Sequence, residues 1–591
     1  MFSRLKESFA HTPRTLRLVW RSSPRGSVAL GLLTIIASLI PLGVAYAGKR
    51  IMDAVVDRSR EHTWDWVLIE LAAVAVASFG QRGLGLVRQL LGARLSLDIN
   101  TMILVKAQDL ELRHFEDAEF YDKLTKARRE ASSRPLSVVT ETFQLLQNTI
   151  TLVGYVILLV QWSGLAVLGL IAAAVPATIA EVRYSSAAFR MRNRRSPASR
   201  QLNYLEYVLA NDEHAKEVKL FGLGPVLLDR FRTLGQSFYD DDKKLAISRA
   251  GAAGALSLLG TGAFYVAYAL MALAAAAGRL TLGNMVLFVM AFRQGQQAFQ
   301  SILTAIGGMY EDNLYMSNLF EYLDITVAAP PLLLTTGATV DEGIVFDDVG
   351  FQYPGQKGWA LRHVSLRIAK NESLALVGHN GAGKTTFIKL LTRLYEPTEG
   401  RILLDGRDLR SWDRDALRKR IGVVFQDFNQ YQFKVRENVG LGSVDHREDQ
   451  ARIVRAVELG GATEVVAHLS DGLETQLGKW FKDGTELSGG QWQKVALARA
   501  FMREEADILV LDEPTAALDA EAEHAVFERF RKLAKERTTI LISHRFPTVR
   551  MADRIIVLEG GQVQEEGTHD GLVAAGGRYA SLFRLQAQGY L

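Results

Sequence analysis

The chain has 591 residues, which is too long for one hydrophobic core and indicates about three or four domain-sized units. Hydrophobic residues make up 48% of it and the mean hydropathy is slightly positive, which favours a membrane protein with a soluble part. The net charge of +4 indicates no class of partner, and the lack of cysteine excludes disulfides, thiolate metal sites and a cysteine nucleophile. The 11 His residues show no spacing typical of metal ligands, so a metal centre held by protein ligands is not expected.

Long apolar runs separated by basic stretches fill the first half of the chain. Residues 26–48 contain no charged side chain, and this run exceeds the roughly 20 residues that cross a bilayer. Five further runs follow, at residues 67–86, 136–160, 165–179, 252–277 and 285–306. The first run also resembles a secretory signal that would be cleaved after Ala45-Tyr46-Ala47, but it is longer than the core of such signals. We therefore predict a transmembrane domain of six helices over residues 1–325.

The distribution of Lys and Arg predicts the orientation of these helices. Basic residues gather before the first run and in the two long connections, near residues 87–135 and 180–251. The connection 161–164 carries no charge, and 278–284 carries one Arg. Because cytoplasmic loops are enriched in Lys and Arg, both termini and both long loops are predicted to be cytoplasmic. The long loops show helical apolar spacing, so their tips, near residues 115–121 and 212–221, are expected where a soluble domain can touch them.

The composition changes after a linker that we place at residues 326–342, which contains Ala328-Ala329-Pro330-Pro331. Short β-rich runs then alternate with helical stretches over residues 343–591, which predicts a soluble α/β domain.

A phosphate-binding loop follows the first buried strand of this second half. Residues 378–385 read Gly-His-Asn-Gly-Ala-Gly-Lys-Thr and fit the pattern G-x-x-x-x-G-K-[ST]. Glycines allow the backbone N–H groups to face phosphates, and the Lys supplies a cation. The candidate nucleotide-binding residues here are Gly378, Asn380, Gly381, Gly383, Lys384, Thr385 and Thr386.

An apolar strand that ends in two carboxylates lies further along, at residues 508–513. Because such a strand presents its carboxyl end at the ligand edge of a sheet, Asp512 is a candidate Mg²⁺ ligand. Glu513 is the candidate to polarise the attacking water, a role that phosphoryl transfer requires. The alternative interpretation is a core strand with a capping acid before Pro514.

One motif between these two is specific to a family. Leu487-Ser488-Gly489-Gly490-Gln491 resembles the signature of ABC ATPases, although it also fits an ordinary N-capped helix start. Four more residues, in order along the chain, resemble other ABC motifs: Tyr353 the aromatic that stacks on adenine, Gln426 the Q-loop glutamine, Asp519 the D-loop aspartate and His544 the switch histidine. The architecture resembles that of bacterial ABC half-exporters, with a helical membrane domain fused to an α/β P-loop ATPase.

This resemblance implies ATP and Mg²⁺ as cofactors, with Thr385, Gln426 and Asp512 as metal ligands and Glu513, His544 and Gln426 as catalytic residues. It also implies that ATP is sandwiched between the phosphate-binding loop of one subunit and Ser488–Gln491 of another. The expected partner is thus a second half-transporter subunit. Because no catalytic motif is degenerate, a homodimer is favoured over a pair with a related chain.

The implied function is ATP-driven export by alternating access from the cytoplasm across the cell (inner) membrane. Polar residues within the apolar runs suggest an amphipathic cargo, such as an antimicrobial or modified peptide or a drug-like compound. They are Gln144, Gln147, Asn148, Arg293, Gln296, Gln297 and Gln300, with Tyr265 and Tyr268 nearby. The alternative for these residues is hydrogen bonding between helices. The alternative functions are a lipid flippase on the same scaffold and an ATP-gated channel or regulatory subunit, and no nucleic-acid partner is expected.

One position departs from the family pattern. Many exporters carry an acidic residue shortly before the signature, and this chain has Lys479 there. The hypothesis is that Lys479 pairs instead with an acid of the second long loop, Glu213 or Glu217.

Overall fold

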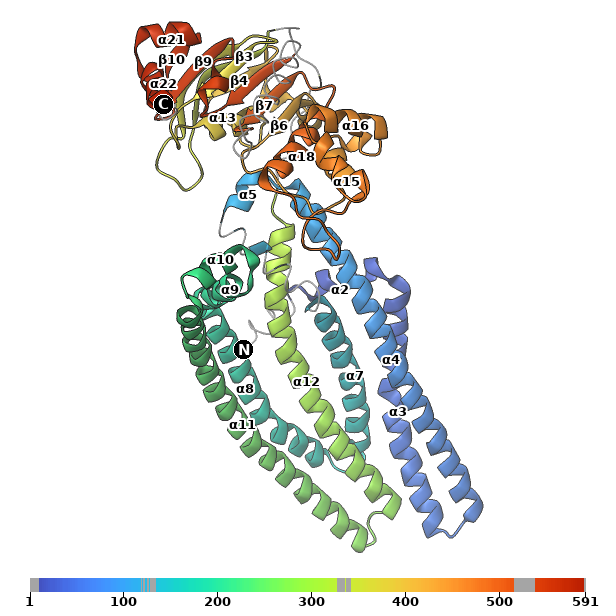
Figure 1. Ribbon diagram of the computed structural model, residues 1–591. Helices are drawn as coiled ribbons and strands as arrows, with labels where there is room; N and C mark the ends of the chain where they lie inside the picture. Colours follow the sequence, from blue (N-terminus) through green and yellow to red (C-terminus); the bar gives the residue numbers. More distant parts are fainter. Residues whose placement is uncertain are drawn as a thin grey trace. The chain divides into compact units, whose positions relative to one another are not determined.

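The computed structural model describes residues 10–117, 134–326, 342–514 and 537–588, together with Phe120, Lys123, Leu124, Ala127 and Thr335. It forms two compact units, one of Met1–Leu110 and Asp117–Val327, the other of Glu111–Glu116 and Ala328–Leu591 (Figure 1). A six-residue segment from the first half of the chain therefore belongs to the second unit. The linker that the sequence predicts lies almost entirely outside the described residues.

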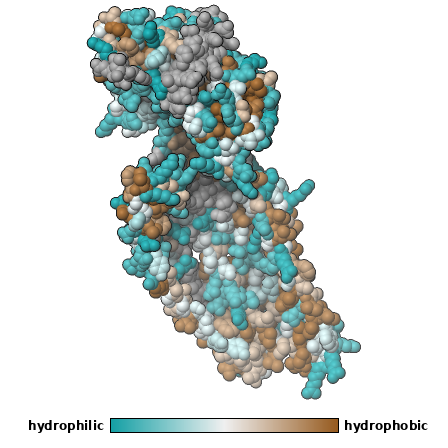
Figure 2. Space-filling model, in the orientation of Figure 1, coloured by the Kyte–Doolittle hydropathy of each residue, from teal (hydrophilic) through white to brown (hydrophobic). Residues whose placement is uncertain are grey.

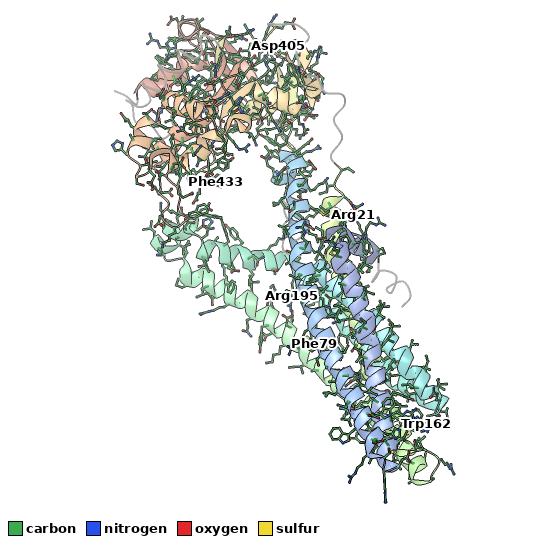
Figure 3. All side chains as sticks on the ribbon, turned by 90° about the vertical axis from the view of Figure 1, so that its right-hand side faces the viewer. Arg21, Phe79, Trp162, Arg195, Asp405 and Phe433 are labelled. Atoms are coloured by element: carbon green, nitrogen blue, oxygen red, sulfur yellow. The ribbon has the colours of Figure 1, made fainter. Side chains whose placement is uncertain are left out.

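The first unit is helical. Its elements are α2 (Thr12–Ser22), α3 (Pro24–Val56), α4 (Arg60–Asp109), α7 (Arg134–Val160), α8 (Gly164–Arg194), α9 (Ser196–Ala210), α10 (Asp212–Leu220), α11 (Gly224–Ala276) and α12 (Leu282–Leu323). Five of the six apolar runs lie inside one long helix each, and the run 252–277 ends one residue after α11. Helices α4 and α11 extend far beyond the start or end of their runs, to 50 and 53 residues. Figure 3 places Arg21 near one end of this unit and Trp162 at the opposite end.

Four helices among the described residues, α3, α4, α7 and α11, are long and apolar enough to cross a membrane. Large apolar side chains such as Leu68, Phe79, Ile157 and Leu258 are exposed along them, as expected of surface that faces lipid rather than water. The predicted span in α12 falls short of this apolar character, because its middle carries one Arg and several Gln residues.

Helix α12 packs against α7, α3 and α8. Arg134 at the start of α7 donates to Asp312 near the end of α12, at 2.8 Å. One turn further into α12, a Cβ on Gly308 would lie only 2.1 Å from the Glu141 carboxylate, so glycine leaves room there for the Glu141 side chain. The two helices thus run antiparallel.

The second unit is an α/β domain with two sheets. A four-stranded sheet has the order β2-β1-β4-β5 and a six-stranded sheet the order β10-β9-β3-β8-β7-β6. The strands are β1 (Ile344–Phe351), β2 (Leu361–Ile368), β3 (Ser373–Val377), β4 (Glu399–Leu404), β5 (Arg407–Asp408), β6 (Ile421–Val424), β7 (Ile508–Asp512), β8 (Thr538–Ile542), β9 (Arg554–Glu559) and β10 (Gln562–Gly567). Every residue of β7 and β8 is buried, which is typical of parallel strands covered on both faces.

The helices of this unit are α5 (Leu112–Glu116), α13 (Lys384–Leu391), α14 (Arg414–Lys419), α15 (Val435–Gly440), α16 (Gln450–Leu459), α17 (Thr463–Ala467), α18 (Gly489–Phe501), α20 (Phe546–Val549), α21 (His569–Ala575) and α22 (Arg578–Gln588). In the six-stranded sheet, β6, β7, β8, β3 and β9 are parallel, so their carboxyl ends meet at one edge. The predicted fold class, a helical membrane domain followed by an α/β domain, is confirmed.

Candidate nucleotide site

The phosphate-binding loop connects β3 to α13 and depends on glycine at two tight positions. A Cβ on Gly378 would lie 2.4 Å from the carbonyl oxygen of Leu558, and one on Gly383 would lie 2.6 Å from that of Ala360. Gly383 also has a φ of 103°, which other residues rarely adopt. Gly381 has a φ of 80° with open space around it. The loop therefore curls as the sequence predicts and leaves its outer side open, where Asn380 and Thr385 are exposed.

Lys384 lies within this curl and holds it closed. Its amine donates to the carbonyl oxygens of Gly378 at 2.7 Å and His379 at 3.0 Å. Burial lowers the pKa of Lys384, while Glu513 and Asp512 oppose this shift. An ammonium held by two neutral carbonyls can exchange them for anionic phosphate oxygens, because hydrogen bonds to charged acceptors are stronger.

Asp512 ends β7 at the carboxyl edge of the sheet and is 2% exposed. Burial, followed by repulsion from Glu513, raises its pKa to about 6, while Lys384 and a hydrogen bond from Thr385 act the other way. Its Oδ2 is buried without a hydrogen-bond partner among the described residues. A buried carboxylate oxygen with an open valence, beside a threonine hydroxyl, fits a hard divalent cation such as Mg²⁺.

Three of the predicted catalytic residues meet at Glu513. Its carboxylate accepts from the Gln426 amide at 2.9 Å and pairs with Nε2 of His544 at 2.9 Å. Burial and the nearby Lys384 lower the pKa of His544, while Glu513 raises it. Glu513 itself has a φ of 50°, a conformation that costs of order 1–3 kcal/mol for a residue other than glycine. The surrounding bonds hold the carboxylate at this strained position.

Tyr353 lies beside the loop in an aromatic group. Its ring centroid is 4.9 Å from that of Phe351 and 5.4 Å from that of Tyr395, and its hydroxyl is 3.1 Å from the Thr386 hydroxyl. The Lys389 amine lies 5.3 Å from the Tyr353 ring centroid. Tyr353, the predicted adenine-stacking residue, thus contacts two side chains of α13, the helix that begins with Lys384.

The signature segment forms an N-capped helix start. The Ser488 hydroxyl accepts from the Gln491 N–H at 3.3 Å, and the Gln491 side chain accepts from the Ser488 N–H at 2.8 Å, so the two residues close a capping box at α18. Within the described residues their hydrogen bonds run to each other and not to the phosphate-binding loop. Gly489 and Gly490 are the first two residues of α18. The predicted Asp519 lies outside the described residues.

Sequence reasoning missed one part of this site, which comes from the first half of the chain. The Glu116 carboxylate, at the end of α5, accepts from the Lys389 amine at 2.9 Å and from the Tyr395 hydroxyl. Burial alone would raise the pKa of Glu116, but these two hydrogen bonds outweigh it and lower the pKa. The sequence predicts a contact near residues 115–121, and the described contacts lie at Glu111–Glu116.

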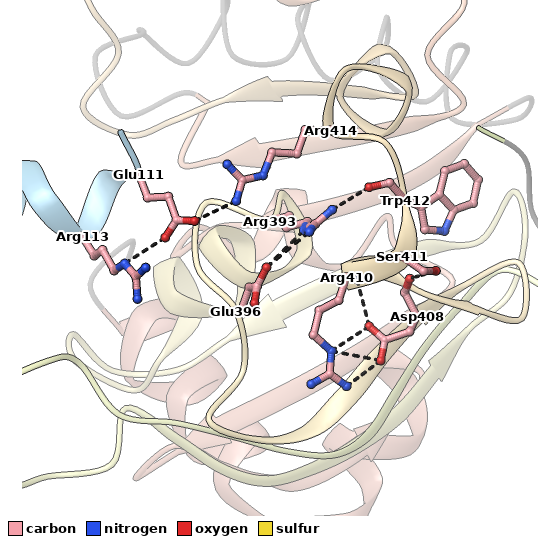
Figure 4. Close-up of polar contacts among 9 residues, drawn as sticks. All are labelled: Glu111, Arg113, Arg393, Glu396, Asp408, Arg410, Ser411, Trp412 and Arg414. Carbon is pink, nitrogen blue, oxygen red and sulfur yellow. Dashed lines mark hydrogen bonds and ion pairs between the residues drawn. The ribbon is translucent and has the colours of Figure 1, made fainter. Parts of the chain in front are cut away.

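The other end of the same segment is also held. Glu111 pairs with Arg414 at 2.8 Å and with Arg113 at 2.8 Å, next to the group formed by Arg393, Glu396 and Trp412 (Figure 4). The Leu112 side chain packs against the core of the α/β domain. Glu111–Glu116 is therefore fixed by polar contacts at both ends and one apolar contact between them.

Comparison with known proteins agrees with this geometry. The sequence model of the ABC transporter family matches residues 361–516. The subtilin transport ATP-binding protein SpaT of Bacillus subtilis is 32% identical over 95% of this chain and 92% of its own length. An ATP-dependent lipid A-core flippase of Thiobacillus denitrificans is 33% identical over 84% of each chain.

A solved structure of a bacterial Atm1-family ABC exporter with ATP bound is similar over nearly the whole chain. It superposes with a TM-score of 0.78 at 25% identity and covers 95% of this chain and 98% of its own. The fused membrane and ATPase units, the assembled ATP-site motifs and these full-length relatives lead to one conclusion: the chain belongs to the ABC transporter family, as a half-transporter that couples ATP hydrolysis to export.

Proposed function

We propose that this chain exports an amphipathic peptide or peptide-like compound from the cytoplasm, as a homodimer in the cell (inner) membrane with both termini cytoplasmic. The observation that carries the cargo assignment is a polar stripe on α12. Exposed Arg293, Gln297, Gln300, Ser301 and Thr304 follow one another at helical spacing, and Figure 2 shows hydrophilic residues gathered over the middle of this helix. On the other side of α12, Ala291, Phe292, Ala298, Ala305 and Met309 are buried.

A stripe of this kind does not suit a surface that faces lipid. An arginine at the centre of a membrane helix costs about 2.5–3.5 kcal/mol on insertion scales, and unsatisfied amides are also costly in hydrocarbon. Polar residues at this depth therefore face a water-filled path or a neighbouring chain. The stripe is open within one subunit, which supports a path between two subunits.

The chemistry of the stripe supports a peptide-like cargo. Its amides donate to and accept from peptide groups, and Arg293 attracts a carboxylate. Tyr265 and Tyr268 are exposed on α11, next to Phe264, whose ring centroid lies 6.1 Å from that of Phe292 on α12. Gln144 of α7 is exposed as well, while Gln147 and Asn148 are half-buried.

Gln296 supports the other interpretation, hydrogen bonding and packing between helices. Its amide nitrogen lies 2.5 Å from the position that a Cβ on Gly260 of α11 would occupy. Of the two neighbouring glutamines, Gln297 thus belongs to the exposed stripe and Gln296 to the contact between α11 and α12.

At the ATP site, we assign phosphate binding to the glycine-rich loop, Lys384 and Thr386, and adenine stacking to Tyr353. Thr385, Gln426 and Asp512 would hold Mg²⁺, which neutralises charge on the transferred phosphoryl oxygens. Glu513 orients the attacking water, and Gln426 and His544 hold its carboxylate in position. Ser488–Gln491 of a second subunit, with Asp519, completes the site, because an N-capped glycine turn at a helix start binds anions.

The test is transport by the purified full-length protein in lipid vesicles. Amphipathic peptides are expected to stimulate ATP hydrolysis and to accumulate in inside-out vesicles. Gln297→Leu and Arg293→Leu should each raise the half-stimulating peptide concentration roughly tenfold, the effect of losing about 1.4 kcal/mol of binding. Val153→Leu, which changes an exposed apolar residue of α7, is the matched control and should leave the stimulation unchanged.

Other outcomes separate the competing functions. Movement of labelled lipid between leaflets without peptide uptake would replace the peptide assignment with a lipid flippase. Downhill ion conductance that needs only ATP binding would indicate a gated channel.

A further inference from the structure

Helix α22 contacts two separate segments of the ATP site. At its first residue, Arg578 lies 2.5 Å from Nε2 of His379, the second residue of the phosphate-binding loop. Further along, the Gln586 side chain accepts from the Phe546 N–H at 3.2 Å, two residues after His544. The Phe546 ring also packs edge-on against Tyr579 and Phe583, with centroids 5.3 and 5.1 Å away.

The start of α22 is fixed to the sheet. The Glu565 carboxylate of β10 accepts from the N–H groups of Arg578 and, at 2.9 Å, Tyr579. A Cβ on Gly577 would lie 2.1 Å from this carboxylate, so glycine is what lets it reach the helix start. Tyr579 is fully buried, and its hydroxyl lies 2.7 Å from Nδ1 of His569. The Arg578 side chain thus extends from a rigid base.

The contact between Arg578 and His379 has a defined polarity. Because a guanidinium only donates, Nε2 of His379 must accept, which leaves the ring proton on Nδ1. Arg578 is also paired with Glu559 at the end of β9, at 3.1 Å. The backbone carbonyl of His379 meanwhile accepts from Lys384. Arg578 therefore fixes the side chain of the residue whose carbonyl orients the phosphate-binding lysine.

We propose that α22 is a positioning element that holds the phosphate-binding loop and the His544 segment at a fixed spacing. Arg578 is the positioning residue for the loop, through His379, and Gln586 is the positioning residue for the His544 segment, through Phe546. This rests on the assignment of the loop as the phosphate site and is independent of the cargo.

The two contacts predict different kinetic effects of their loss. Arg578→Ala should raise KM for ATP about tenfold with little change in kcat, because the loop is no longer held in its binding geometry. Arg578→Lys should restore part of the affinity, since one donor remains. Gln586→Ala should lower kcat several-fold with KM nearly unchanged. Arg584→Ala is the control on the same helix, because the Arg584 side chain is exposed and its hydrogen bond among the described residues is to Ala580 of its own helix, and it should change neither constant.

A double-mutant cycle tests whether Arg578 acts through His379. Basal ATP hydrolysis of the full-length protein is measured for His379→Ala, Arg578→Ala and the pair. We expect the pair to match the stronger single variant, since both remove one contact. Multiplied effects in the pair, or an unchanged KM in Arg578→Ala, would overturn the proposal.

Two further results distinguish a positioning role of Arg578 from a structural role and from a wrong assignment of the ATP site. In Arg578→Ala, KM could rise and kcat fall by the same factor, together with a lowered melting temperature that Arg578→Lys does not restore. That result would show a merely structural role for Arg578 and would also overturn the proposal. A wild-type protein with no basal hydrolysis would instead contradict the assignment of the ATP site itself.

Discussion

At the scale of single residues, the site is organised around carboxylates that cannot all be satisfied by the protein. Asp512 is buried with one oxygen open, and Glu513 is held in a left-handed conformation by Gln426 and His544. Local strain and unsatisfied polar groups are typical of functional sites, where a ligand supplies what the fold leaves out. Both acids lie at the end of the same buried strand, so one strand positions the proposed metal ligand and the residue proposed to orient water.

Glu513→Gln should separate binding from turnover. The amide keeps the size of the side chain and can still bond to its neighbours, but it cannot polarise water. ATP binding should be retained while hydrolysis falls by about two orders of magnitude or more, which traps a closed, nucleotide-loaded dimer. The measurement is steady-state ATP hydrolysis together with retention of labelled ATP. Undiminished hydrolysis would overturn the catalytic assignment of Glu513.

At the scale of elements, α5 belongs to the α/β unit although the rest of that unit begins only at Ala328. Its Glu116 carboxylate accepts hydrogen bonds from Lys389 on α13 and from Tyr395. The side chains of Lys389 and Tyr395 both lie beside the Tyr353 ring. Two direct contacts of Glu116 therefore connect α5 to the residues beside Tyr353.

Glu116→Gln should weaken this link without removing the site. The amide loses the charge that pairs with Lys389, so cargo-stimulated ATP hydrolysis should fall at least several-fold while basal hydrolysis changes less than about twofold. Arg113→Gln is the matched control in the same helix, since the ion pair that it removes is with Glu111 of the same segment. Equal stimulation in the Glu116 variant and the wild type would show that this contact is not on the coupling route.

The elements also show how far the sequence could be read. The run 136–160 corresponds closely to α7, because there the helix ends with the apolar segment. The run 67–86 recovers only part of α4, because apolar composition reports the lipid-facing portion and not the helix beyond it. Local spacing predicts the loop glycines and Asp512. The contacts of Glu116 with Lys389 and of Arg578 with His379 join residues 273 and 199 positions apart, and no local pattern marks such pairs.

At the scale of the whole molecule, one chain carries every ATP-site motif. In its signature segment, however, Ser488 and Gln491 bond to each other and cap the start of α18. The loop that precedes the signature is also open to a partner: Lys479 is exposed, and its neighbour Trp480 is 86% exposed. The N–H of Trp480 donates to Gln432 at 2.8 Å, which fixes the backbone while both side chains project outward. The pairing of Lys479 with Glu213 or Glu217, which are exposed on α10, stays a prediction.

Lys479→Glu tests the pairing with the acids of α10. It should lower cargo-stimulated hydrolysis by about two- to fivefold, the range for one partly exposed ion pair, and Glu217→Lys in the same chain should restore part of it. Lys482→Glu, at another exposed lysine of the same loop, is the control for charge alone. If Lys479→Glu leaves stimulation unchanged, Lys479 has no such partner.

The composition of the second unit has a consequence for exchanging parts between relatives. Its boundary in space includes Glu111–Glu116, although these residues are more than two hundred positions away from the rest of the unit in the chain. A chimera that joins this membrane half to the ATPase half of another exporter at the linker would set Glu111 and Glu116 against foreign residues in place of Arg414, Lys389 and Tyr395. Transplanting residues 111–116 together with the ATPase half keeps both partners of every such contact, so compatible halves are defined by three cuts in the chain and not by one.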